Sequence, residues 1–125
     1  MRSCYWLCME YNIPLNYIDD FLSAMKQDMT KSRYDSYIEL ENYMWGSASV
    51  IGHIMTFIVG YKNKSAFEDA RALGEAMQLA NFLRDIDEDY QARNRIYLPT
   101  KDIHMFGVTE DSISEQKMSL ELKNL

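Results

Sequence analysis

Two aspartates, Asp85 and Asp89, have the side chains and the spacing in this chain that best suit chemistry. Residues four apart lie one above the other on an α-helix, so these carboxylates can share a hard cation. Gln78 and Asn81 fall on the same stripe, which covers about 80° of a helix with 3.6 residues per turn. Because Mg²⁺ is typically held by one or two carboxylates together with substrate phosphates, the stripe predicts a site for Mg²⁺ and a diphosphate. Mn²⁺ would suit the same oxygen ligands.

The stripe needs a long helix to position it. Residues 70–90 are apolar around most of the helical circumference, which is typical of a buried helix whose polar side chains need partners. Ser65 and Glu68 form a capping-box pattern, so we expect one helix over 65–90. Asp87 and Glu88 lie off the stripe, and we expect them to be a solvated acidic helix end.

The rest of the chain also favours helices, and we expect an all-α fold. Apolar periodicity and capping patterns predict helices over 3–11, 15–29, 36–60, 101–106 and 111–122. Only 5 Gly and 2 Pro leave little room for a turn-rich β fold, and 125 residues predict one domain, 1–125. A net charge of −6 argues against nucleic-acid binding.

The third expected helix contains an uncharged stretch over 42–61 that is close to the length of a membrane span. Polar and small residues interrupt it, so we expect a buried helix instead. Gly46, Ala48, Ser49 and Gly52 would let another helix or a flat polyene chain approach closely. With no signal-peptide pattern at the N-terminus, we expect a cytoplasmic protein.

Several segments, in order, resemble the phytoene and squalene synthase family. Residues 74–99, GEAMQLANFLRDIDEDYQARNRIYLP, resemble its second aspartate-rich segment, roughly Gly, Gln-Leu-x-Asn-x-Leu-Arg-Asp, Glu-Asp, Arg-x-Tyr-x-Pro. Residues 13–34, 43–52 and 100–113 continue the match, so the resemblance covers 13–113. It implies a part of the isoprenoid (terpenoid) synthase helical fold.

Two departures from the family pattern matter. Family members are longer and carry a first Asp-x-x-x-Asp helix, which no segment of 1–125 supplies, and the last dozen residues lose the resemblance. We therefore expect an internal fragment that holds half of a two-sided metal site. Such a fragment should be inactive alone.

The resemblance implies a reaction and a role for each site residue. The activity would be the head-to-head condensation of two geranylgeranyl diphosphates to phytoene, through a cyclopropyl diphosphate, in carotenoid biosynthesis. Asn81, Asp85 and Asp89 would hold Mg²⁺, with both aspartates catalytic, and Gln78 would bind diphosphate. Tyr43 would face a carbocation through its ring, although an ordinary packed tyrosine is the alternative.

Further residues would bind substrate by the same resemblance. Ala48 and Gly52 would line the prenyl pocket, and Arg84 and Arg95 would contact the diphosphate. For Arg84, a salt bridge to Glu88 is the competing interpretation. Arg95, like Arg33, could instead be a surface charge.

Two other functions stay open. A squalene or dehydrosqualene synthase would use farnesyl diphosphate, and the squalene enzyme would also need NADPH. A non-catalytic assembly factor related to the synthases would be an interaction module, although intact Asn81, Asp85 and Asp89 argue against it. For either enzyme, release of an apolar product would favour association with a membrane surface.

Overall fold

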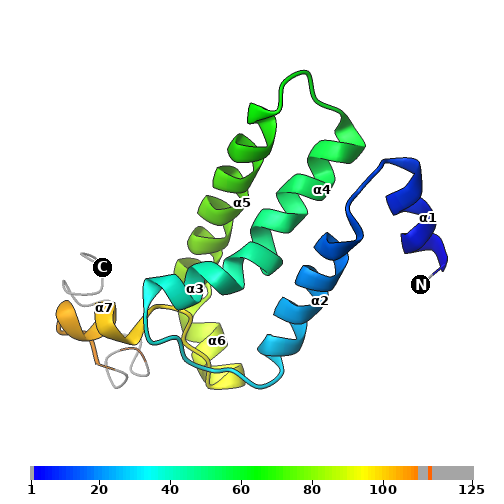
Figure 1. Ribbon diagram of the computed structural model, residues 1–125. Helices are drawn as coiled ribbons and strands as arrows, with labels where there is room; N and C mark the ends of the chain where they lie inside the picture. The colour runs from blue at the N-terminus through cyan, green and yellow to red at the C-terminus, as the bar shows by residue number, and fades with distance from the viewer. Residues whose placement is uncertain (1, 110–112, 114–125) are drawn as a thin grey trace. The chain divides into compact units, whose positions relative to one another are not determined.

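The computed structural model describes residues 2–109 and 113, and these are helical with no strand among them. The elements are α1 (Arg2–Glu10), α2 (Leu15–Asp28), α3 (Tyr37–Met44), the π-helical turn η1 (Trp45–Ser49), α4 (Val50–Val59), α5 (Ser65–Arg84), α6 (Ile86–Arg93) and α7 (Thr100–Met105) (Figure 1). The expectation of an all-α fold is confirmed. The helix expected over 111–122 lies outside the described residues. Within the described part, no helix combines the length and the hydropathy needed to cross a bilayer.

Two expected helices are not continuous. The helix expected over 36–60 is divided by η1, where the backbone N–H of Val50 bonds to the carbonyl oxygen of Trp45, five residues earlier. The helix expected over 65–90 is broken at Asp85, whose φ of −100° and ψ of 11° lie in the sparsely allowed region between helix and strand. Apolar periodicity cannot predict either break, since neither a longer hydrogen-bond span nor one non-helical residue changes the order of apolar and polar residues.

The chain forms two compact units. The first consists of Met1–Met29 and Tyr43–Gln78, and the second of Thr30–Asn42 and Leu79–Leu125. Helices α3 and α5 each contribute residues to both units.

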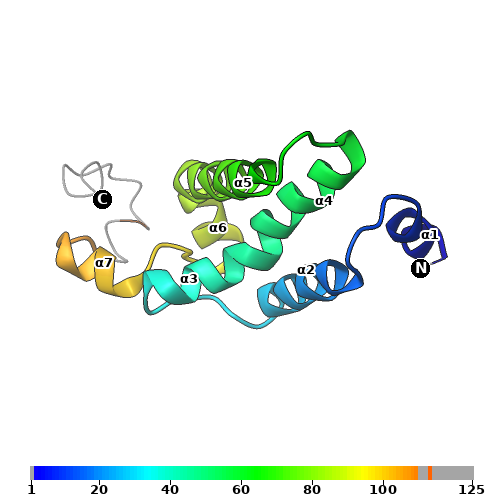
Figure 2. The same ribbon diagram turned by 45° about the horizontal axis from the view of Figure 1, so that its top comes forward.

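Close helix packing defines the first unit, in which α4 runs between α2 and α5 (Figures 1 and 2). A Cβ atom added to Gly46 would lie 2.5 Å from the carbonyl oxygen of Asp20 on α2, and one added to Gly52 would lie 2.5 Å from that of Ala70 on α5. Glycine at these two positions is therefore what allows the backbones to approach.

An aromatic cluster fills the space around α4 in the same unit. The rings of Tyr17, Trp45 and Phe67 each lie within 5.5 Å of the buried His53 ring, measured between centroids. His53 Nδ1 lies 3.2 Å from the Tyr17 hydroxyl oxygen. The cluster fixes Trp45, the first residue of the π turn.

The second unit is built around the loop that follows α6. Backbone hydrogen bonds join Ile96 N–H to Ser32 O at 3.0 Å and Thr100 N–H to Tyr34 O at 2.8 Å. Tyr97 stacks on Phe82 at 4.1 Å and on Tyr34 at 5.9 Å. The buried core of this unit consists of Ile96, Leu98, Ile103, Val108 and Ile113, with Ile86 and Tyr90 packed against it.

Candidate functional site

Asp85 and Asp89 keep their one-turn spacing despite the break in the helix. The backbone N–H of Asp85 bonds to Asn81 O at 2.9 Å, and that of Asp89 bonds to Asp85 O at 2.8 Å. Asp85 is therefore joined by an i to i−4 backbone bond to the helical turn on each side of it. The Asp85 side chain is 33% exposed and that of Asp89 is 14% exposed, so Asp85 is partly open to solvent and Asp89 is mostly buried.

Each carboxylate is bound by an arginine from its own segment. Arg84 donates from Nε and Nη2 to the two oxygens of Asp85, both at 2.6 Å, and Arg93 donates from Nη1 to Asp89 Oδ1 at 2.7 Å. The hydrogen bonds from Arg84 lower the pKa of Asp85 below its ordinary value. The ion pair of Arg84 is thus with Asp85 and not with Glu88. The i,i+4 spacing of Asp89 and Arg93 is the signal that could have predicted the second pair.

The donor set fits a magnesium ion that also binds phosphate. Among residues 2–109 and 113, no group of three or more His, Cys, Asp or Glu side chains converges to hold a metal ion. Two carboxylates with the amide of Asn81 are too few for a cage made of protein alone, but Mg²⁺ typically takes one or two carboxylates and completes its shell with water and phosphate. Arginine binds phosphate as readily as it binds carboxylate. Arg84 and Arg93 can therefore exchange an aspartate for a phosphate group.

The remaining stripe residues and their acidic neighbours are placed as follows. Gln78 and Asn81 are half-buried on α5, Gln78 in the first unit and Asn81 in the second. Glu88 is exposed as expected. The expectation that Asp87 is fully solvated is wrong, because one of its carboxylate oxygens is buried.

Two further arginines of the second unit are held by residues after α6. Arg33 donates to both the carbonyl and the side-chain oxygen of Asn94, whose φ of 50° is left-handed. Arg95 donates from Nη1 to the Tyr97 hydroxyl at 3.0 Å, with its guanidinium 5.5 Å from the same ring. Arg33 and Arg95 are therefore positioned side chains, and their role towards diphosphate stays a prediction.

Tyr43 belongs to the first unit and is buried. Its hydroxyl donates to Asp28 Oδ2 on α2 at 2.8 Å, which holds the hydroxyl end of the side chain against α2. Ala48 and Gly52 follow on η1 and α4, where Gly52 meets the backbone of α5. The acceptor Asp28 was not predicted, because a contact between helices leaves no local sequence pattern.

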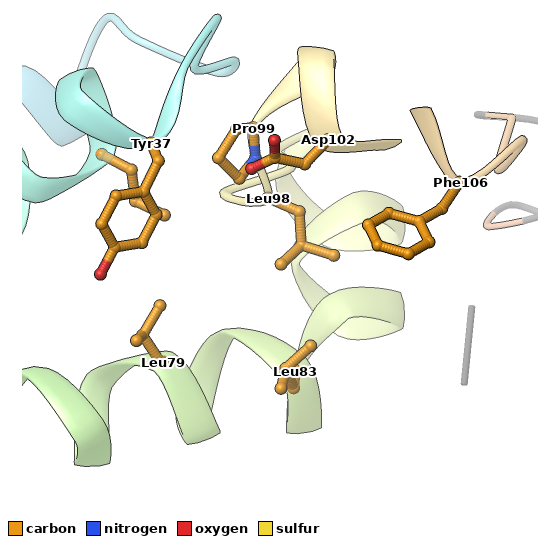
Figure 3. A pocket seen from close by; sticks show the side chains of 8 residues that line it. Tyr37, Leu79, Leu83, Leu98, Pro99, Asp102 and Phe106 are labelled. Atoms are coloured by element: carbon orange, nitrogen blue, oxygen red, sulfur yellow. The ribbon is translucent and has the colours of Figure 1, made fainter. Parts of the chain in front are cut away.

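The second unit also contains a cavity of about 290 Å³, separate from the stripe (Figure 3). Leu79 and Leu83 form one side of it, on the face of α5 that points away from Asn81. Its other lining residues are apolar except for Tyr37 and Asp102. With a carboxylate and no cation in its lining, this cavity is unsuited to a diphosphate.

Comparison with known proteins identifies the family. The family model described as squalene/phytoene synthase matches residues 1–125. The chain is 33% identical over 115 residues to the chloroplastic phytoene synthase of Daucus carota, covering 87% of this chain and 29% of that protein. It is 31% identical over 110 residues to the hydroxysqualene synthase of Rhodopseudomonas palustris, covering 88% of this chain and 37% of that protein. The chain belongs to the squalene/phytoene synthase family.

A solved structure supports the same assignment. The crystal structure of squalene synthase HpnC from Alicyclobacillus acidocaldarius matches with a TM-score of 0.86 and 28% sequence identity, covering 98% of this chain and 46% of that one. The fold is thus that of the all-α isoprenoid synthases. The chain spans less than half the length of the relatives described here.

Proposed function

We propose that this chain contributes half of the catalytic machinery that joins two molecules of geranylgeranyl diphosphate head to head to give phytoene. The observation that carries the proposal is the Asp85 and Asp89 pair, one turn apart and each bound by an exchangeable arginine, in a chain that belongs to this family. The similarity to the phytoene synthase of Daucus carota supports this product.

In this proposal Asn81, Asp85 and Asp89 hold Mg²⁺. When bound, the metal stabilises the negative charge that develops on the departing diphosphate. Gln78 donates from its amide to a diphosphate oxygen, and Arg84 turns from Asp85 to the same anion. Loss of diphosphate from one substrate leaves an allylic cation, which adds to the double bond of the second with loss of a proton to give a cyclopropyl diphosphate. Loss of the second diphosphate, rearrangement and loss of a second proton then give phytoene.

The apolar part of the substrate would lie against the first unit. Tyr43 presents its ring to the allylic cation, where a desolvated cation–π contact is worth about 2 kcal/mol. Its hydroxyl bond to Asp28 holds the direction of the side chain. Ala48 and Gly52 leave room for the prenyl chain, and Arg95 contributes charge to the diphosphate.

A second candidate is a squalene-type synthase that uses farnesyl diphosphate. The hydroxysqualene synthase of Rhodopseudomonas palustris and squalene synthase HpnC both match this chain, and they favour this alternative. A squalene product would also require a hydride from NADPH. The same stripe residues would serve, because both substrates lose diphosphate in the same way.

The test is incubation of the full-length synthase with Mg²⁺ and either geranylgeranyl or farnesyl diphosphate, with and without NADPH, and mass spectrometry of the hydrocarbon product. Phytoene from the longer substrate is the expected result. A product from farnesyl diphosphate alone would establish the second candidate. No product from either substrate, with a folded protein, would favour a non-catalytic role. The 125-residue chain alone should give no product, since it supplies metal ligands from one side only.

A further inference from the structure

The π turn η1 lies between two residues to which the proposed function assigns contact with substrate. Its N–H to O bond from Val50 to Trp45 spans five residues, one more than in an α-helix. Such turns are rare, and they occur mostly as single turns within α-helices, frequently at functional sites. Tyr43 precedes this turn and Gly52 follows it.

The turn carries a cost that other contacts must offset. Ser47 Oγ is buried and makes no hydrogen bond within the described part of the chain. A buried hydroxyl that lacks a partner loses its hydration without compensation. Something outside the turn must therefore favour it over an unbroken α-helix.

The last residue of the turn, Ser49, is fixed by a carboxylate on α5. Ser49 is fully buried, and its Oγ donates to Glu75 Oε1 at 2.8 Å. The same oxygen accepts from Arg71 Nε at 2.7 Å, one turn earlier on α5. The Glu75 side chain is 19% exposed, so its charge is held close to Arg71 in a partly desolvated setting. Ser49 would lose a charge-assisted partner if Glu75 were absent.

The first residue of the turn, Trp45, is fixed from two sides. Its Nε1 donates to Asp20 Oδ2 on α2 at 3.0 Å, and the Arg71 guanidinium lies 5.8 Å from its ring. Arg71 therefore contacts the start of the turn directly and its end through Glu75. Together Arg71 and Glu75 form a clamp that holds both ends of η1 against α5.

We propose that Glu75, supported by Arg71, is a positioning residue that maintains the π turn and thereby sets the rotation of Tyr43 relative to Gly52. One residue corresponds to about 100° of rotation on an α-helix, so relaxation of the turn would move Tyr43 by up to that angle about the axis. The consequence for catalysis rests on the proposed function. The dependence of the π turn on Glu75 is independent of that function.

The test compares variants of the full-length protein. Glu75→Ala removes the clamp, whereas Glu75→Gln keeps an amide oxygen that can still accept from Ser49. Ser49→Ala removes the same hydrogen bond but deletes only a hydroxyl group. If Glu75→Ala does not fold, Ser49→Ala tests whether this bond maintains the π turn. Glu68→Ala changes an exposed carboxylate on the same helix and is the matched control.

Two measurements separate positioning from simple stabilisation. In Glu75→Ala, amide hydrogen exchange at Val50 should accelerate at least about tenfold more than at amides late in α4, because only the turn is released. In the same variant kcat should fall at least about tenfold while KM changes by less than about threefold. Glu75→Gln should recover most of both effects, and Glu68→Ala should show neither.

Three results would overturn the proposal in distinguishable ways. Unchanged exchange at Val50 in Glu75→Ala would mean that the turn does not depend on the clamp. Equal acceleration along all of α4 and α5 would mean that Glu75 only stabilises the fold. Selective exchange at Val50 with an unchanged kcat would mean that the turn does not position Tyr43. A wild-type protein without prenyl transfer would contradict the proposed function, and the exchange result would still decide whether Glu75 holds the turn.

Discussion

Two groups of polar side chains are held in contrasting ways, those around η1 in the first unit and the candidate carboxylates in the second. In the first unit the partners are far apart in sequence: Tyr43 bonds to Asp28 across 15 positions, and Ser49 bonds to Glu75 across 26. In the second unit the carboxylates of the candidate site pair locally, Asp85 with its neighbour Arg84 and Asp89 with an arginine four residues later.

This difference separates positions that must be held from positions that must exchange partners. Buried hydrogen bonds between helices form only in the folded protein, and losing one partner leaves the other unsatisfied in the interior. Exposed local ion pairs contribute little, typically below about 1 kcal/mol. Asp85, the more exposed of the two aspartates, can therefore give up its arginine to a metal and a diphosphate at small cost, whereas Tyr43 cannot easily be moved.

The largest expected effect is on activity, at Asp85. Asp85→Asn in the full-length synthase keeps the shape but removes the charge that would hold Mg²⁺, and we expect a loss of at least about a hundredfold in kcat/KM. The melting temperature should hardly change, because the group is exposed. Steady-state kinetics and calorimetry provide the two measurements.

The control for this prediction is Glu88→Gln, a neighbouring exposed carboxylate off the stripe. It should leave activity within about twofold of wild type. Equal losses in the two variants would mean that general negative charge, and not the Asp85 and Asp89 pair, is what the reaction requires.

The next largest effect is on stability, at the packed glycines of the first unit. Gly52→Ala places a Cβ 2.5 Å from the Ala70 carbonyl oxygen, so we expect a loss of about 1 to 3 kcal/mol in the free energy of unfolding. Gly74→Ala is the matched control, since both substitutions gain about 1 kcal/mol in helix propensity but the Cβ at Gly74 would lie 3.0 Å, and not 2.5 Å, from the nearest carbonyl oxygen. Chemical denaturation of both variants measures the difference. Equal stability would contradict close packing of α4 on α5 at Gly52.

The features that could be predicted from the sequence are those that leave a local pattern in it. Apolar periodicity and the capping residues predicted the helices and the all-α fold, and spacing alone predicted the polar stripe from Gln78 to Asp89. The break at Asp85 was not predictable in this way, because it depends on backbone angles and not on composition. The π turn was not predicted for a related reason. The residues from Trp45 to Ser49 are the same whether each backbone hydrogen bond spans four residues, as in an α-helix, or five.

Contacts between helices could not be predicted from the sequence. Asp20, Asp28 and Glu75 each accept a hydrogen bond from a residue of another helix, and no periodicity marks such a pair. One signal was available: Glu75 is a charged residue directly after Gly74, at a position where α5 was expected to be buried. A charge on a buried face needs a partner.

A smaller effect is expected from the hydrogen bond between Tyr43 and Asp28. In a double-mutant cycle of Tyr43→Phe and Asp28→Asn, the coupling energy should be about 1 to 2 kcal/mol, because a hydroxyl donates to a buried or partly buried carboxylate. The same cycle on Arg84→Gln and Asp85→Asn should give less than about 1 kcal/mol, as exposed pairs do. Chemical denaturation of the seven proteins, with the wild type shared by the two cycles, provides both values. A larger coupling for the arginine pair would reverse the contrast between the two units.

The smallest expected effect is the pH dependence contributed by Glu39 in the second unit. Its carboxylate pairs with Lys31 and accepts the Asp35 backbone N–H at 2.7 Å, and these contacts, that of Lys31 first, hold its pKa below the ordinary value of 4.5. A carboxyl group with a lowered pKa in the folded state contributes stability above its unfolded pKa, and that contribution is lost as the pH falls through the folded pKa. Glu39→Gln should therefore lower the melting temperature at neutral pH and match wild type in acid, where Glu39 is protonated. Melting temperatures between about pH 3 and about pH 7 test this, with Glu68→Gln as an exposed control. A difference between Glu39→Gln and wild type that persists unchanged below the folded pKa would mean that packing, and not charge, is what Glu39 contributes.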